Sequence, residues 1–180
     1  MYLEKNGKNV FRKKMNTYIY KMNACLVIDI DDTLYVHKSG PSRLGFMDYD
    51  NIKPNPDLTK ELQRLQYPKY ILTNATFDHA NEILNKMDLD DEFKKIYARN
   101  NMPTMKPHKG CYERVQRDIV KDLNKQVDEY LFFDDLLENL KGAREQDWIP
   151  IWISPNYKEA YKYPFVYRAF PSLTEALKHI

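Results

Sequence analysis

The sequence predicts an α/β fold in which a parallel sheet is sandwiched by helices. Short apolar runs alternate along the chain with segments whose apolar residues recur at helical spacing. Such alternation is typical of strand–helix–strand units, whose strands run parallel. Polar residues directly follow three of the apolar runs, and parallel sheets bind ligands at the carboxyl ends of their strands. We therefore expect a ligand site at one edge of the sheet.

The elements can be placed in chain order. An apolar run from Ala24 to Ile28 is the first expected strand, and it ends abruptly at Asp29. Asn55 and Pro56 begin a helix as cap and first-turn residue, and Tyr67-Pro68 closes it. The capping-box pattern from Ser172 to Glu175 opens a last short helix. Between them we expect strands over 70–73, 130–133 and 149–153, and helices over 77–88, 108–120 and about 137–147.

Length and composition are those of a single globular domain. The chain has 180 residues, 43% of them hydrophobic, and a formal net charge of +2, which selects no strongly charged partner. Residues 1–23 form a basic amino-terminal extension. We interpret it as a solvated leader, although a nucleic-acid contact stays open. Its charged residues are Lys5, Lys8, Arg12, Lys13, Lys14 and Lys21 against Glu4.

The cysteine pattern and hydropathy indicate an intracellular protein. Cys25 lies in the first strand and Cys111 in a helix, with neither metal-ligand spacing nor a disulfide framework. The sequence has no apolar stretch of membrane-spanning length and no apolar signal core at its amino terminus. A cytoplasmic location without a membrane partner is the expectation.

Carboxylates at the strand ends suggest metal-assisted chemistry. Asp29 and Asp31 can face one cavity, where one acts as a nucleophile and the other transfers protons. A divalent cation between Asp29 and Asp134 or Asp135 would offset their repulsion. Oxygen ligands indicate magnesium, and zinc is disfavoured because no His or Cys cluster accompanies them.

Three further residues could bind a phosphate. Thr73 offers a hydroxyl and Asn74 an amide at the end of the expected strand over 70–73, while Lys106 supplies a positive charge next to Pro107. Phosphoryl transfer depends mostly on positioning and electrostatic stabilisation. An acid pair, a cation, a lysine and donors are therefore sufficient for it.

These residues carry a resemblance to the haloacid dehalogenase superfamily of phosphohydrolases, from about residue 24 to the carboxyl end. The resemblance implies a three-layer Rossmann-like catalytic core over 24–180. The motifs are Asp29-Ile30-Asp31-Asp32-Thr33-Leu34-Tyr35, Leu72-Thr73-Asn74-Ala75, Lys106-Pro107-His108, and Phe132-Phe133-Asp134-Asp135 with Asn139 after it.

Roles follow from this resemblance. Asp29 would be the nucleophile that forms an aspartyl-phosphate, and Asp31 the general acid and base. Thr33 would support the loop, and it belongs with Thr73, Asn74 and Lys106 to the expected substrate site. Magnesium would be bound by Asp29, the backbone carbonyl of Asp31, Asp134 and Asp135.

Within the superfamily, the chain most resembles pyrimidine 5′-nucleotidase-like members, but with two departures. Leu136 replaces the small residue that commonly follows the paired Asp. Residues 34–53 leave room for a flap or vestigial cap but not for the helical cap domain of those nucleotidases. His37 and Arg43 lie in this flap, where we interpret them as exposed polar residues. His79 either orients the site or simply packs near it.

The expected function is magnesium-dependent hydrolysis of a small phosphate ester, with a nucleoside 5′-monophosphate as leading candidate. One alternative is a capless phosphatase acting on a phosphoprotein or a nucleic-acid end. Another is a non-catalytic binding protein on the same fold. Nucleic acid is a possible but not favoured partner, and a homo-oligomer whose neighbouring subunit covers the open site is left open. The tyrosine-rich tail over 157–167 is expected to pack on the domain.

Overall fold

The computed structural model describes residues 23–37 and 49–180. Its centre is a six-stranded sheet with the order β3-β2-β1-β4-β5-β6, and every neighbouring pair is parallel. The strands are β1 (Ala24–Ile28), β2 (Lys69–Leu72), β3 (Lys95–Tyr97), β4 (Glu129–Asp134), β5 (Ile149–Ile153) and β6 (Arg168–Phe170). The predicted α/β fold class is confirmed, and the strand order is that of a Rossmann-like sheet.

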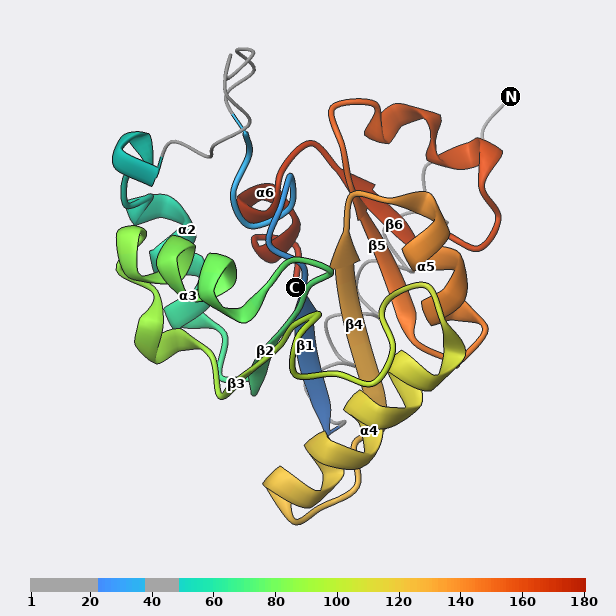
Figure 1. Cartoon of the computed structure of the whole chain (residues 1–180). Coiled ribbons are helices and arrows are strands. Elements are labelled where there is room, and N and C mark those ends of the chain that lie inside the picture. The colour runs from blue at the N-terminus through green and yellow to red at the C-terminus, as the bar shows by residue number, and fades with distance from the viewer. Residues whose placement is uncertain (1–22, 38–48) are drawn as a thin grey trace, which may run out of the picture.

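Helices cover both faces of this sheet. The α-helices are α2 (Pro56–Arg64), α3 (Phe77–Lys86), α4 (Lys109–Leu123), α5 (Leu137–Arg144) and α6 (Leu173–Leu177). Three short 3-10 helices are η1 (Tyr49–Asn51), η2 (Asp90–Glu92) and η3 (Tyr157–Lys162). Figure 1 shows α2 and α3 on one side of the sheet and α4 and α5 on the other.

The alternation of side chains along β1 separates two cores. Leu26 and Ile28 pack with the apolar faces of α2, α3 and α6. Cys25 and Val27 point to the opposite face, where α4 and α5 pack around the buried Trp148. This two-residue period is what a strand buried on both faces requires. The sandwich therefore has three layers, and β1 lies in its middle.

The order of the strands reverses at β1, and this position gathers the site. Ile28 is in register with Ile71 of β2 and with Phe133 of β4. The residues that follow these positions therefore emerge at the same edge of the sheet. Ligands bind at such a switch point in open α/β sheets.

Two strands and several boundaries differ from expectation. The strands β3 and β6 were not predicted; they are three-residue strands at the two edges of the sheet and are only partly buried. Helix α4 runs to Leu123, beyond the expected end at 120, and stops at Asn124 in a left-handed conformation with φ of 48°. The tail expected as a packed loop contains η3, in which Tyr161 is exposed. Tyr163, directly after η3, packs edge-on against Trp152.

Some predictions fall outside the described residues. They are the basic extension, apart from Asn23, and most of the flap over 34–53, including Arg43. Among the helices of residues 23–37 and 49–180, none has the length and apolar character needed to cross a bilayer.

Helix α5 approaches the loop that carries Lys106, and Gly142 makes this approach possible. A Cβ atom on Gly142 would lie 2.7 Å from the carbonyl oxygen of Pro107 and 3.1 Å from its Cβ. No side chain tolerates such contacts with backbone, so the helix or the loop would have to shift. Gly142 thus helps to set the distance between α5 and the Lys106 loop.

We predict that Gly142→Ala lowers the free energy of unfolding by about 1–3 kcal/mol, because the added methyl group overpacks this contact. Urea denaturation monitored by tryptophan fluorescence measures the change. Gly110→Ala in α4 is the matched control, since its Cβ would meet side-chain atoms of His108 and Thr104 at 3.3 and 3.4 Å. That control should change stability by less than about 1 kcal/mol. Equal stability of Gly142→Ala and wild type would contradict the conclusion that Gly142 sets the distance between α5 and the Lys106 loop.

Candidate active site

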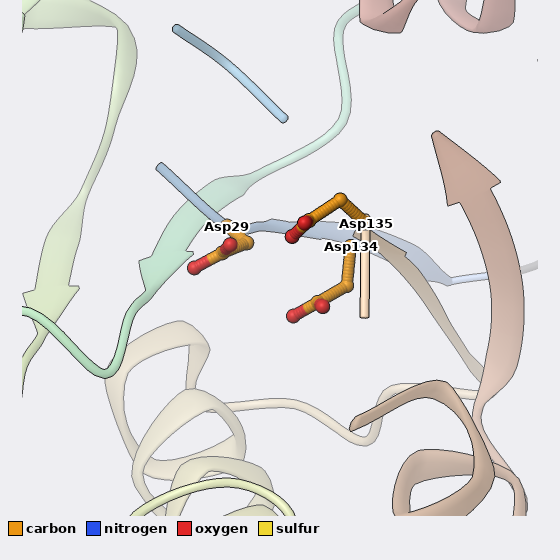
Figure 2. Close-up of side chains that lie close together, drawn as sticks. All are labelled: Asp29, Asp134 and Asp135. Carbon is orange, nitrogen blue, oxygen red and sulfur yellow. The ribbon is translucent and has the colours of Figure 1, made fainter. Parts of the chain in front are cut away.

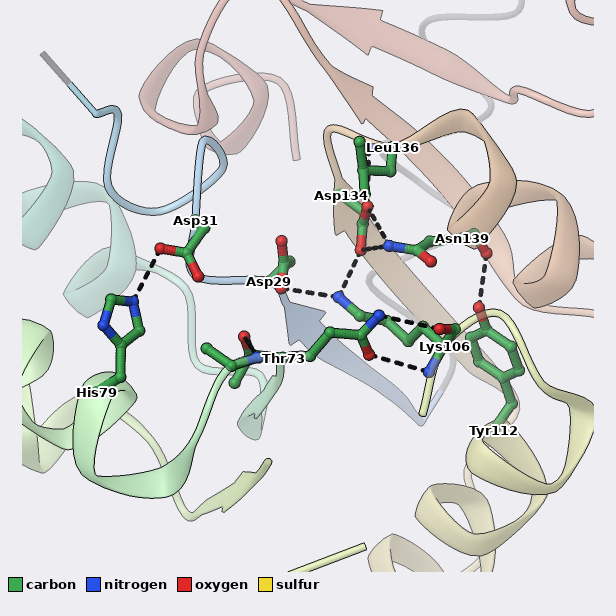
Figure 3. A network of polar contacts seen from close by, with 11 residues as sticks. Asp29, Asp31, Thr73, His79, Lys106, Tyr112, Asp134, Leu136 and Asn139 are labelled. Carbon is green, nitrogen blue, oxygen red and sulfur yellow. Dashed lines mark hydrogen bonds and ion pairs between the residues drawn. The ribbon is translucent and has the colours of Figure 1, made fainter. Parts of the chain in front are cut away.

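A buried lysine lies between two buried carboxylates at the carboxyl edge of the sheet. Lys106 Nζ is 2.7 Å from Asp29 Oδ1 and 2.6 Å from Asp134 Oδ2. The three side chains have exposed fractions of 1%, 8% and 0%. Figure 3 shows the ammonium group between the ends of β1 and β4. Residues far apart in sequence thus form one charged cluster shielded from water.

The ammonium group keeps its charge there. Burial alone would lower the pKa of Lys106, but Asp134 and Asp29 outweigh that effect and raise the pKa above its ordinary value. An ammonium has three hydrogens. Two of them serve the carboxylates, which leaves a third.

A third carboxylate joins this cluster. Asp29, Asp134 and Asp135 can each offer one oxygen, and these oxygens all lie within 4.8 Å of one another (Figure 2). Burial raises the pKa of Asp29 to about 7 and that of Asp135 to about 6, and the neighbouring Asp134 adds to both shifts. One lysine cannot balance three carboxylates. The cluster therefore fits a hard divalent cation, because all its donors are oxygens.

The loop that carries Lys106 is fixed by Asn74. Its Nδ2 donates to Lys106 O at 2.9 Å, and its Oδ1 accepts from Lys106 N at 3.0 Å. The peptide bond between Lys106 and Pro107 is cis. The Asn74 amide was expected to face a phosphate. In the structure this amide instead joins the end of β2 to the Lys106 loop.

Asp134 is held by donors from α5. Leu136 N donates to Asp134 Oδ1 at 2.8 Å, and Asn139 Nδ2 lies 3.0 and 3.1 Å from the two carboxylate oxygens. Tyr112 donates its hydroxyl to Asn139 O at 2.8 Å. The Leu136 side chain is exposed and its backbone makes the contact. Leu136 in place of the usual small residue therefore does not remove the backbone hydrogen bond to Asp134.

Two buried threonines lie in the segments that follow β1 and β2. Thr73 is buried, and its Oγ1 accepts from Ala75 N at 3.0 Å, which leaves the hydroxyl hydrogen available as a donor. Thr33 is also buried, and its Oγ1 finds no hydrogen-bond partner within the described part of the chain. Its backbone N–H donates to Ile30 O, so Thr33 belongs to the turn after β1.

Asp31 contacts two histidines. His79 Nε2 lies 2.9 Å and His37 Nε2 lies 2.8 Å from Asp31 Oδ1. Burial tends to raise the pKa of Asp31, but the hydrogen bonds from His79 and His37 outweigh it and lower the pKa below its ordinary value. Tyr49 OH lies 2.8 Å from His79 Nδ1. The resting carboxylate is thus charged and held on one side.

Asp32, the third carboxylate of the first motif, lies in the turn after β1. Asp32 adopts a left-handed conformation with φ of 54°, and its Oδ1 accepts from His37 N at 3.1 Å. This geometry belongs to a turn rather than to the charged cluster. Asp32 thus finishes the turn after β1.

Comparison with known proteins identifies the family. The family model described as haloacid dehalogenase-like hydrolase matches residues 44–147, more than half of the chain. The chain belongs to this family of hydrolases. The match begins after the first motif, so it does not include Asp29 and Asp31. The structure places these two residues just after the end of β1.

Solved structures share the fold at low sequence identity. A HAD-hydrolase from Bacillus subtilis bound to magnesium superposes with a TM-score of 0.57 at 22% identity, over 68% of this chain and 52% of that chain. The L-2-haloacid dehalogenase of Xanthobacter autotrophicus gives 0.55 at 18%, over 72% and 62%. This chain spans less than two thirds of either protein. A haloacid dehalogenase-like family hydrolase from Streptococcus pneumoniae gives 0.60 at 14%, over 89% and 99%.

The structure brings together most residues that the motifs named and adds several contacts. Asp29, Lys106, Asp134 and Asp135 meet as expected from the strand ends. His37 is exposed in the loop after β1, as expected, and its ring also contacts Asp31. For His79 it left both roles open. Sequence patterns gave no signal for three other residues that support the site, namely Tyr49, Tyr112 and Trp152, whose Nε1 donates to Asp135 O at 2.8 Å.

Magnesium should stabilise the folded protein through the three-carboxylate cluster. An ion that binds only the native state adds about 2.7 kcal/mol when its concentration is 100 times its Kd. We expect a rise in the thermal unfolding midpoint of the wild type with added magnesium, measured by calorimetry. Asp135→Asn should reduce this rise, because it removes one charged ligand and preserves the shape of the side chain.

The matched control for that experiment is Asp91→Asn. Asp91 belongs to an exposed acidic run in η2, away from the sheet edge that carries the cluster. Its substitution should leave the magnesium effect unchanged. Equal magnesium responses in wild type and Asp135→Asn would contradict the cation site.

Proposed function

We propose that this protein is a magnesium-dependent phosphomonoester hydrolase that works through an aspartyl-phosphate on Asp29. The observation that carries the proposal is the position of Lys106 between Asp29 and Asp134, with Asp135 beside them. A buried nucleophile, a fixed cationic donor and a set of oxygen ligands are the parts that phosphoryl transfer needs.

Binding of the phosphate rests on this chain's own donors. The third hydrogen of the Lys106 ammonium and the hydroxyl of Thr73 would each take a phosphate oxygen. Asn74 keeps the Lys106 backbone in place while they do so. Asp29, Asp134 and Asp135 would hold magnesium, and the Asp31 backbone carbonyl is a further proposed ligand. When bound, the ion supplies positive charge that offsets repulsion between the phosphate and Asp29.

The reaction then needs two displacements at phosphorus. Asp31 is a charged carboxylate at rest, so it first takes a proton from solvent. A carboxylate oxygen of Asp29 then attacks, the bond between phosphorus and the leaving-group oxygen breaks, and Asp31 donates its proton to that oxygen. In the second step Asp31 takes a proton from a water molecule as the water attacks the aspartyl-phosphate. The bond between phosphorus and the Asp29 oxygen breaks and free phosphate leaves. Asp29 is again a carboxylate, and Asp31 holds the proton that the next turnover needs. Lys106 remains charged throughout and stabilises the negative charge on the phosphoryl oxygens.

The substrate class follows less directly from the site. A small phosphate ester such as a nucleoside 5′-monophosphate remains the leading candidate, on the resemblance of the second and third motifs to nucleotidases. Dehalogenation uses an aspartate nucleophile but has no need for a cluster of three carboxylates. The cluster therefore favours phosphate chemistry over halide release. We place the protein in the cytoplasm, where its two buried, unpaired cysteines would stay reduced.

Purified wild-type protein should release phosphate from 4-nitrophenyl phosphate in the presence of magnesium and lose this activity in excess chelator. Asp29→Asn should lower kcat by at least about 10³-fold, because it removes the nucleophile. A parallel assay for halide release from 2-chloropropionate should be negative. A panel of nucleotides, sugar phosphates, phosphopeptides and phosphorylated oligonucleotides then ranks the substrate classes.

Asp32→Asn is the matched control, because Asp32 is the neighbouring carboxylate in the turn and Asn also tolerates its left-handed backbone. Its activity should stay within about threefold of wild type, an ordinary effect for a residue outside the reacting groups. The proposal fails if Asp29→Asn releases phosphate as fast as the wild type, or if halide is released and phosphate is not.

A further inference from the structure

The contacts of Asp31 are one-sided. Both imidazole nitrogens that approach it, from His79 and from His37, meet the same oxygen, Oδ1, at 2.9 and 2.8 Å. Within residues 23–37 and 49–180, neither histidine contacts the other oxygen, Oδ2. Figure 3 shows the contact between one Asp31 oxygen and the ring of His79. The two oxygens of this carboxylate therefore have different surroundings.

The contact with Tyr49 fits a His79 tautomer that carries its hydrogen on Nε2. Tyr49 OH and His79 Nδ1 are 2.8 Å apart, so a hydroxyl that donates to Nδ1 leaves the ring hydrogen on Nε2. Nε2 is the nitrogen that faces Asp31. The chain Tyr49–His79–Asp31 can therefore run with every donor pointing toward Asp31, and no additional proton is needed on the imidazole.

The elements that supply these groups are each anchored separately. His79 lies in the first turn of α3, where its backbone N–H donates to the cap residue Thr76 at 3.3 Å. Tyr49 belongs to η1, and His37 belongs to the loop after β1. Three segments thus converge on one carboxylate that is itself a third exposed. Without such contacts an aspartate at this exposure would be free to turn about its side-chain bonds.

Resting on the function proposed above, we infer that His79, with Tyr49 behind it, and His37 are positioning residues that occupy Asp31 Oδ1 and so make Oδ2 the oxygen that transfers the proton. In the first displacement the Oδ2–H bond breaks and the proton goes to the leaving-group oxygen. In the second, Oδ2 takes a proton from the attacking water. The histidines exchange no proton with substrate in either step, so atoms and charge balance without them.

Leaving-group dependence separates positioning from a merely structural role. Phenyl phosphate and 4-nitrophenyl phosphate have similar size, but phenolate needs protonation far more than nitrophenolate does. His79→Ala should lower kcat/KM for phenyl phosphate by about 100-fold, the usual effect of a misplaced catalytic group, and that for 4-nitrophenyl phosphate by no more than about tenfold. The loss should fall on kcat, because Asp31 does not hold the phosphate.

Conservative variants sharpen this test. His79→Gln places an amide N–H near the position of Nε2. It should recover most of the wild-type ratio of kcat/KM for phenyl phosphate to kcat/KM for 4-nitrophenyl phosphate. Tyr49→Phe removes one hydroxyl and should lower the phenyl phosphate rate by about three- to tenfold. His179→Gln is the matched control, since His179 packs on Phe170 at the far end of the chain, and it should leave the ratio unchanged.

The outcomes are distinct. Equal losses on both esters in His79→Ala, or no loss at all, would overturn the inference while leaving the phosphatase proposal intact. If wild type hydrolyses neither ester with magnesium, the proposed function itself fails and this inference falls with it.

A second measurement needs no variant: nitrogen-15 spectra at pH 8 should show His79 Nδ1 without a hydrogen. A protonated Nδ1 would overturn the assignment even if His79→Ala does not fold.

Discussion

The buried pair of ionic contacts from Lys106 to Asp29 and Asp134 is the interaction on which the site depends. Removing one partner of such a buried pair typically costs about 3–5 kcal/mol, because the remaining charge has no water to solvate it. The structure keeps this arrangement by surrounding it with further donors. Asn74 holds the Lys106 backbone, and Asn139 with the Leu136 N–H holds Asp134. The lysine thus joins the ends of β1 and β4 and the loop before α4 into one unit.

The same charges explain why the site suits a cation and an anion together. Three carboxylates around one ammonium leave excess negative charge, which a hard divalent ion can balance. With that ion in place, the third hydrogen of Lys106 and the Thr73 hydroxyl are the donors that the proposed phosphate would meet. The position of β1 at the reversal of strand order makes this possible, because it brings the ends of three strands to one edge.

Much of this arrangement could be predicted from sequence because the informative patterns are local. Apolar runs that end in Asp29, Thr73 and Asp134 predicted both the strands and the meeting of these side chains. The edge strands β3 and β6 gave no such signal, because they are short and only partly buried. An amphipathic pattern likewise located α3 without showing what its first turn would touch.

The polar supports could not be predicted for a different reason. Asn74 and Lys106 are 32 positions apart, and Asp31 and His79 are 48 apart. Hydrogen bonds over such separations depend on how the loops cross at the sheet edge, which no residue spacing records. Amides and histidines in loops are common, so their composition alone does not distinguish a support from an exposed side chain.

The most direct test of the central claim is to trap the phosphorylated protein. Wild type is mixed with magnesium and a phosphate ester, quenched in acid during turnover, digested and examined by mass spectrometry. The account predicts a phosphoryl group on Asp29 and none in Asp29→Asn treated in the same way. A phosphoryl group on any other residue, or phosphate release with no covalent species at any quench time, would contradict it.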